Sequence, residues 1–176
     1  MKMQDHEKRT YTFLLILTIF TTIVFQLWRT LFNNFSVETI GLDSAAVGLI
    51  QTVREIPGFM AFFVIYIILV IKEKWVAFLS VLVMSIGVAI TGYFPTKYGL
   101  IFTTLLMSIG FHYFETINQS LSMQYFSKKN FTSATANLRR FGALASIIVG
   151  VVITSLTTVL NYQQLYLFFG ALGIIG

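Results

Sequence analysis

The residues best suited to chemistry lie within one long apolar segment, from about Tyr98 to Phe126. Polar side chains recur along this segment at helical spacing: Ser108, His112, Glu115, Gln119 and Ser122. An ionisable group in hydrocarbon costs at least about 2.5 kcal/mol, so such groups usually face a bundle interior or a water-filled cavity. The stripe therefore predicts a helix whose polar side encloses part of a polar pathway.

Within this stripe, His112 and Glu115 could relay or hold a proton. Counted at a rise of about 1.5 Å per residue, Glu115 lies about 16 Å and Arg140 about 13 Å from the same end of two successive helices. A charge pair between Glu115 and Arg139 or Arg140 would stabilise both charges and make protonation of the carboxylate depend on its partner. A static contact between helices is the alternative interpretation. A metal site at His112 and Glu115 would lack ligands.

Arg139 and Arg140 lie about 100° apart around their helix, so they cannot both face one cavity. Gly142, Ser146 and Gly150 share the face of Arg139, and this small-residue series predicts close packing against a neighbouring helix. Arg140 is therefore the expected cavity residue. The alternative is that both arginines extend to the lipid headgroups.

A second charged group lies near the far ends of the first two apolar segments. Arg29 lies near the end of the first, and Arg54 and Glu55 precede Pro57 and Gly58 in the second. Because proline can kink a helix, we expect Arg54 and Glu55 to lie on a segment that moves between open and closed states. They form either a gating ion pair or two solvated anchors at the membrane interface.

These residues form one candidate site with two roles. The candidates for substrate binding are Gln26, Arg29, His112, Glu115, Gln119 and Arg140, and those for coupling or gating are Glu115, His112, Arg54, Glu55 and Arg139. The charged cavity residues Arg29, Arg54, Glu55, Glu115 and Arg140 sum to three positive and two negative charges. This excess favours a small anionic or zwitterionic solute.

The elements that must position these residues are apolar segments of membrane length. Of 176 residues, 56% are hydrophobic and only 11% are charged, which excludes a small soluble domain. Spans of about 20 residues cross a hydrocarbon layer, and here they cover Tyr11–Phe32, Ala45–Ile71, Trp75–Phe94, Tyr98–Phe126, Thr132–Leu160 and the chain from Leu165 onward. We predict an all-α, polytopic membrane bundle of six transmembrane helices over residues 11–176, after a tail of residues 1–10.

The sixth segment is shorter than the others. From Leu165 to Gly176 a helix would reach only about 18 Å. We therefore expect a truncated last helix, and a chain that is a fragment or one half of a larger protein.

Basic residues indicate how the bundle is oriented. Those of the tail and of alternate turns fall on one side of the predicted membrane: Lys2, Lys8, Arg9, Lys72, Lys74, Lys128 and Lys129. The positive-inside rule then predicts a cytoplasmic amino terminus, in a plasma or inner membrane. The formal net charge of +5 is explained by this topology, so we do not expect nucleic-acid binding.

Composition also limits the chemistry. The chain has no cysteine and two histidines, which excludes disulfides, thiolate metal sites and multi-histidine metal centres. It contains neither a phosphate-binding glycine loop nor a nucleophile with a base at suitable spacing. We expect no enzyme, no cofactor and no metal.

Polarity recurs with a period of three segments. The first and fourth segments are the most polar, the second and fifth are intermediate, and the third and sixth are apolar. A three-helix unit repeated once explains this order, with helices one and four lining a cavity, two and five flanking it, and three and six facing lipid.

In this pattern the chain resembles the amino-terminal half of a major facilitator superfamily transporter. In that family the first and fourth helices of each half line the pathway, as the stripes ending in Arg29 and Asn33 and in Glu115 and Gln119 would do here. The turn Ile71–Trp75 keeps the basic residues of the family's cytoplasmic signature but lacks its glycine and aspartate. The fifth segment lacks the proline typical of drug/proton antiporters.

The resemblance implies a secondary transporter that works by alternating access and is coupled to protons. Its partners would be the lipid bilayer, a small-molecule solute, protons and the missing carboxy-terminal half of the same protein. The alternative is a non-transporting polytopic membrane protein, a sensor or assembly partner, in which the same polar residues are contacts between helices.

Overall fold

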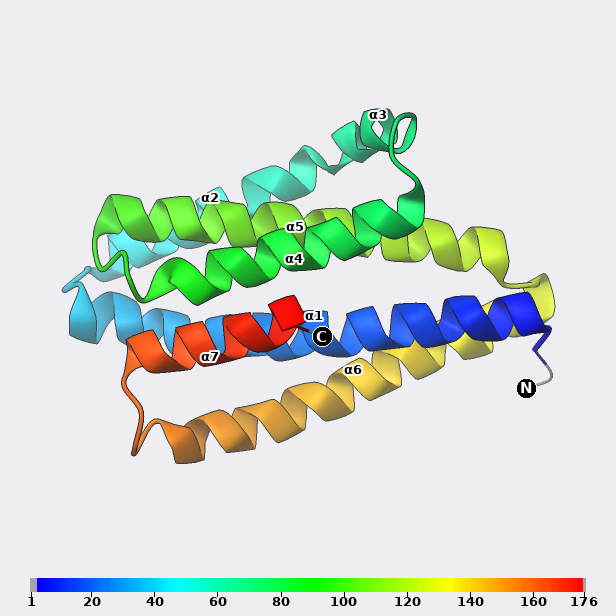
Figure 1. Cartoon of the computed structure of the whole chain (residues 1–176). Helices are drawn as coiled ribbons and strands as arrows, with labels where there is room; N and C mark the ends of the chain where they lie inside the picture. Colours follow the sequence, from blue (N-terminus) through cyan, green and yellow to red (C-terminus); the bar gives the residue numbers. More distant parts are fainter. Residues whose placement is uncertain (1–2, 176) are drawn as a thin grey trace.

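The computed structural model describes residues 3–175, which form a bundle of long helices (Figure 1). The elements are α1 (Asp5–Asn34), the π-helical turn η1 (Phe35–Thr39), α2 (Ser44–Phe59), the 3-10 turn η2 (Ala61–Phe63), α3 (Val64–Ile68), α4 (Glu73–Thr91), α5 (Lys97–Tyr125), α6 (Lys128–Leu156) and α7 (Tyr162–Ile175). No β-strand occurs in this part of the chain. The all-α prediction is therefore confirmed.

Membrane-length helices dominate the described residues. Within 3–175, five helical stretches are long and apolar enough to cross a membrane: α1 with η1, α2 through α3, α4, α5 and α6. The sixth apolar helix, α7, is shorter. The chain therefore has the helices of a membrane bundle, with boundaries within a few residues of those expected for the last four segments.

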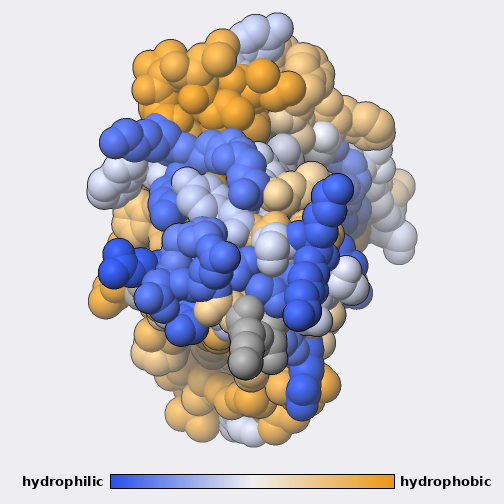
Figure 2. Space-filling view, turned by 90° about the vertical axis from the view of Figure 1, so that its right-hand side faces the viewer, coloured by the Kyte–Doolittle hydropathy of each residue, from blue (hydrophilic) through white to orange (hydrophobic). Residues whose placement is uncertain are grey.

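The turns at one end of the bundle carry most of the basic residues. In Figure 1 the start of α1, the α3–α4 turn and the α5–α6 turn all lie at the right-hand end. Figure 2 views this end directly and shows hydrophilic residues gathered across its middle, between hydrophobic surfaces above and below. Lys2 lies outside the described residues, and the other basic residues predicted to share one side share this end of the bundle.

The first helix begins before the apolar segment. Residues 1–10 were expected to be a tail, but α1 starts at Asp5. Glu7 accepts hydrogen bonds from the backbone N–H of Gln4 (2.9 Å), the backbone N–H of Ser127 (2.8 Å) and Nδ2 of Asn130 (2.9 Å). These donors leave Glu7 only 2% exposed and fasten α1 to the start of α6. Its charge suggested exposure, but donors on a distant helix allow this carboxylate to be buried.

The second span is broken rather than continuous from Ala45 to Ile71. Asp43 caps α2 by accepting a hydrogen bond from the N–H of Ala46 (2.7 Å), and the helix ends at Phe59. Pro57 lies within its last turn, and Met60 (φ −89°, ψ 2°) leaves the helical conformation. The kink expected from Pro57 is thus a break, after which α3 continues away from the other helices (Figure 1).

The bundle core forms around α1, α4 and α5. One buried cluster surrounds Trp28 and Tyr166, where α7 packs against α1 and α4. A second cluster surrounds Leu14 and Phe114 nearer the amino terminus. On the flanks, α2 packs against α5 and α6 packs against α1. Thus α4, expected to face lipid, is buried on one face and exposes Trp75, Phe78 and Leu79 on the other.

Glycine allows α4 and α5 to pack closely. A Cβ at Gly110 of α5 would lie 2.3 Å from the carbonyl oxygen of Ser80 and 2.4 Å from the backbone nitrogen of Met84. A Cβ at Gly87 of α4 would lie 2.6 Å from the backbone nitrogen of Met107. Because these are backbone atoms, the helices could accept a larger residue only by moving apart.

We predict that Gly110→Ala lowers the free energy of unfolding by about 1–3 kcal/mol, the usual effect of overpacking. Gly150→Ala in α6 is the control, because no described atom lies within 4 Å of its Cβ position and alanine favours helix. Thermal unfolding of purified protein in detergent measures both changes. Equal stability of the two variants would contradict the close packing of α4 on α5.

Candidate functional site

A polar groove runs between α1, α5 and α6. It contains two adjacent cavities of about 270 and 530 Å³, which share Thr18, Glu115 and Arg139 in their walls. The smaller cavity also has Gln26 and Arg29 in its wall. The other polar residues of the groove are Thr21, Thr22, Asn118, Gln119, Ser122, Thr132, Thr135 and Ser146. The groove therefore brings Gln26 and Arg29 of the first apolar segment beside Glu115 and Gln119 of the fourth.

Helical spacing explains how α1 and α5 supply their parts of the groove. Thr18, Thr22 and Gln26 follow one another at four-residue intervals on α1, and Glu115 and Gln119 do so on α5. Each set therefore lies on one face of its helix. These are the two faces that meet α6.

The third wall comes from the small-residue face of α6. A Cβ at Gly142 would lie 3.2 Å from Oγ1 of Thr22 and 3.5 Å from Cγ2 of Thr18, so α6 packs close to α1 here. Arg139 shares this face and lines both cavities, whereas Arg140 is absent from their described walls. This placement corrects the expectation that Arg140 faces the cavity. Gly142 lets α6 pack closely on α1 without a side chain that would fill the adjacent space. The same face of α6 therefore packs against α1 and lines the groove.

Glu115 and Arg139 face the same groove without a direct ion pair. In residues 3–175 no direct salt bridge joins Glu115 to Arg139 or Arg140, although Arg139 is close enough to interact electrostatically with Glu115. Depth along two helices does not fix the distance between them. The carboxylate and the guanidinium are therefore both presented to the groove.

Several buried polar atoms of the groove have no hydrogen-bond partner within the described chain. They are Oγ1 of Thr18, Oγ1 of Thr21 and Oδ1 of Asn118. Buried polar groups in proteins nearly always have a partner, either protein or ordered water. These atoms therefore suit a groove filled by water or by a polar ligand.

A second charged cluster lies between α2 and α5. Arg54 and Glu55 form an ion pair, and Nε2 of His112 lies 3.7 Å from Oε2 of Glu55. The hydroxyl of Ser108 donates a hydrogen bond to the backbone carbonyl of Arg54. A Cβ at Gly58 would lie 2.9 Å from Cε1 of His112, so glycine admits the imidazole beside the end of α2.

His112 thus belongs to a different site from Glu115. The sequence placed both on one stripe, but three residues along a helix leave them about 60° apart. Neither His112 nor Glu55 belongs to the described walls of the groove cavities. The expected partner of His112 was Glu115, whereas the structure gives it Glu55.

Aromatic rings connect the charged cluster to the groove. The guanidinium carbon of Arg54 lies 5.7 Å from the ring centroid of Trp28 and 5.9 Å from that of Phe25. Phe25 stacks on Phe111 with centroids 4.2 Å apart, and both rings line the smaller cavity. Phe25 therefore contacts the cluster on one side and the groove on the other. Phe25 and Phe111 were not predicted from the sequence, because aromatic residues do not stand out among the other hydrophobic residues of an apolar helix.

Among the described residues, no three His, Cys, Asp or Glu side chains lie close enough together to bind a metal ion. The groove offers one carboxylate and two arginines, Arg29 and Arg139, with hydroxyl and amide groups between them. Such a set can bind an anion and exchange a proton, but it contains no nucleophile activated by a base.

No protein-family model matches the sequence, and a search of curated proteins gave no match. Function is therefore inferred from the groove and the charged cluster.

Cysteine substitution can show whether the groove holds water. The chain has no native cysteine, so Ala143→Cys and Leu144→Cys each introduce a single thiol. Ala143 lines the groove, whereas Leu144, 46% exposed, points about 100° away around α6. Because the reactive thiolate forms in water, we predict that a polar maleimide labels Ala143→Cys about tenfold or more faster in membranes. Equal rates would mean that the groove is filled by lipid.

Proposed function

We propose that the chain forms half of the substrate pathway of a proton-coupled secondary transporter, similar in design to the major facilitator superfamily. The solute is small and either anionic or zwitterionic, and it crosses a plasma or inner membrane by alternating access. The observation that carries this proposal is the groove in which Arg29, Glu115 and Arg139 lie on helices of membrane length.

The proposal is supported first by the high free-energy cost of exposing charged side chains to the hydrocarbon of a membrane. Arg29, Glu115 and Arg139 are all exposed in the bundle, at positions well inside the apolar segments or near their ends. Facing lipid, each would cost at least about 2.5 kcal/mol near the bilayer centre. A second helical unit that covers the groove and leaves water within it removes this cost. We propose that this unit is the other half of the transporter.

The proposal is also supported by the pattern of helix contacts, which is the pattern expected for a three-helix unit that occurs twice. If α1, α2 and α4 correspond to α5, α6 and α7, then the packing of α2 on α5 corresponds to that of α6 on α1. The packing of α4 on α5 likewise corresponds to that of α7 on α1. Such 3+3 repeats underlie alternating access in this class of transporter. The basic end of the bundle is then cytoplasmic.

The charges of the groove support the solute class. Arg29 and Arg139 outnumber Glu115, so the groove as described carries an excess of one positive charge. A carboxylate or phosphate group suits the two guanidinium groups, which can bind oxyanions through paired hydrogen bonds. An ammonium group of a zwitterion would lie toward Glu115. We assign solute binding to these residues together with Gln26 and Gln119.

Glu115 and the charged cluster divide coupling and gating between them. Glu115 has no direct ion-pair partner in the described chain, so its protonation can respond to a solute bound beside it. Arg54, Glu55 and His112 lie where α2 approaches its break, and they connect α2 to α1 and α5. We propose that this cluster holds α2 against α1 and α5 in one conformation of the transporter, where it closes the pathway. In the other conformation these contacts break and α2 moves away.

Replacement of the Glu115 carboxylate tests the proposal. We predict that Glu115→Gln abolishes solute-driven proton movement in proteoliposomes that contain the chain joined to the second half of the transporter, because the amide does not exchange a proton. A pH dye inside the vesicles reports the movement, and the external solutes are a panel of small carboxylates, amino acids and phosphate. Asp5→Asn is the control, since it removes an exposed carboxylate far from the groove. Absence of proton movement with every solute in the wild type would contradict the proposal.

The same variant separates the alternative function. A sensor or assembly partner would use the polar residues as contacts between helices, as Arg54, Glu55 and His112 are used here. In that case Glu115→Gln should change thermal stability or assembly, with no flux to lose in the wild type.

A further inference from the structure

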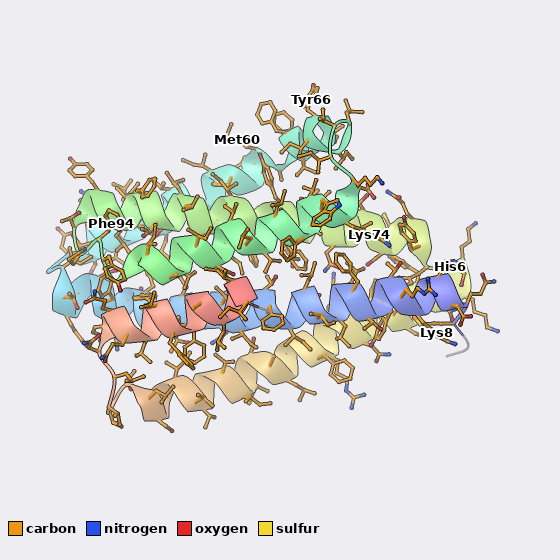
Figure 3. All side chains as sticks on the ribbon, in the orientation of Figure 1. His6, Lys8, Met60, Tyr66, Lys74 and Phe94 are labelled. Atoms are coloured by element: carbon orange, nitrogen blue, oxygen red, sulfur yellow. The ribbon has the colours of Figure 1, made fainter. Side chains whose placement is uncertain are left out.

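A separate cavity lies at the turn between α3 and α4, at the basic end of the bundle. It has a volume of about 490 Å³, and its polar and aromatic wall residues are Lys72, Glu73, Lys74, Trp75 and Tyr125. None of these residues belongs to the groove or to the charged cluster. Figure 3 shows Lys74 at this end of the molecule, below Tyr66 of α3.

The cavity presents two ammonium groups and one carboxylate, so its charged groups sum to one excess positive charge. In residues 3–175 neither Lys72 nor Lys74 forms a salt bridge. Glu73, the carboxylate between them, is bound by Nε2 of Gln124 (2.8 and 2.9 Å) and by the hydroxyl of Ser120 (3.1 Å). Glu73 is therefore held toward α5. Nζ of Lys74 lies 5.0 Å from the ring centroid of Tyr125, which fixes one cation at the cavity edge.

Apolar surface continues from this cationic cavity. Ile68 and Leu121 form part of its wall. Beyond it, α3 and the following turn expose Tyr66 (64%), Leu69 (76%) and Val70 (88%). Figure 2 shows this arrangement at the end of the bundle, where a hydrophobic surface at the height of α3 rises above the hydrophilic band. Trp75, 60% exposed, lies where the two meet and is of the type found at membrane interfaces.

We propose that this cavity binds the headgroup of an anionic phospholipid such as phosphatidylglycerol. The phosphate lies between Lys72 and Lys74, and an acyl chain lies along the exposed side of α3. Charge complementarity selects the anionic headgroup, and the apolar wall favours a lipid over free phosphate. This inference requires that the helices cross a bilayer, but it does not depend on transport.

Quenching of Trp75 by brominated lipids tests this site. The protein has two tryptophans, and Trp28 is buried with 1% exposure. Quenching of tryptophan fluorescence by bromine on an acyl chain, close to the headgroup, therefore reports on Trp75. Nanodiscs of unlabelled phosphatidylcholine receive a small fraction of brominated phosphatidylglycerol or of brominated phosphatidylcholine. We expect stronger quenching by the anionic lipid. Equal quenching by the two lipids in the wild type would overturn the proposal.

Charge variants at the same end of the bundle distinguish a site from a general surface effect. Lys72→Gln with Lys74→Gln should weaken the preference for the anionic lipid roughly tenfold or more. Lys128→Gln with Lys129→Gln is the matched control, which removes equal charge from the next basic turn and should keep the preference. Loss of the preference in both pairs, or in neither, would overturn the proposal. Both variants are first shown to be monodisperse in the nanodiscs.

Free phosphate is the last comparison. Millimolar inorganic phosphate should leave the quenching of wild-type protein unchanged if the lipid is bound through both its headgroup and its chain. Complete reversal of the preference by phosphate would assign the cavity to a soluble anion and overturn the lipid proposal.

Discussion

The fold depends on keeping ionised side chains away from hydrocarbon on helices that must cross it. The structure solves this in three ways. Glu7 is bound by three hydrogen-bond donors at the meeting of α1 and α6. Arg54 is paired with Glu55 and packed against two aromatic rings. Glu115 and Arg139 remain without an ion pair between them, but they face a groove. In the groove these two charges therefore face a polar cavity instead of forming a direct ion pair.

Close packing on the other side of the bundle supports the groove. Glycines bring α4 within backbone contact of α5, and Gly170 of α7 does the same against Ala89 of α4. These contacts fix α1 and α5 from behind, so their polar faces keep one orientation without having to pack against each other. The least buried helices of membrane length, α2 and α6, lie at the two flanks. The closely packed helices α4, α5 and α7 are thus distinct from the more exposed flanking helices α2 and α6.

The charged cluster and the groove share the side chain of Phe25. Phe25 contacts the Arg54 guanidinium and also lines the smaller cavity, while Gly58 brings the end of α2 against His112. The contact between the two sites is therefore an aromatic ring rather than a hydrogen bond. The helix α2 ends just after Pro57, and its continuation, α3, lies at the edge of the bundle (Figure 1). The proposed lipid cavity lies at the α3–α4 turn, beyond the break after Pro57.

The sequence alone determined the helices and the composition of their faces. Apolar length identified each span, and four-residue spacing placed Thr18, Gln26, Glu115 and Gln119 on two polar faces, because the helical period is a local property of the backbone. Only the tertiary structure decided which faces meet. It assigned Arg139 rather than Arg140 to the groove, gave His112 the partner Glu55, and buried Glu7 against α6. The rotation of each helix about its axis is set by packing between residues far apart in the chain, at contacts such as Gly142 on Thr22, and no local period encodes it.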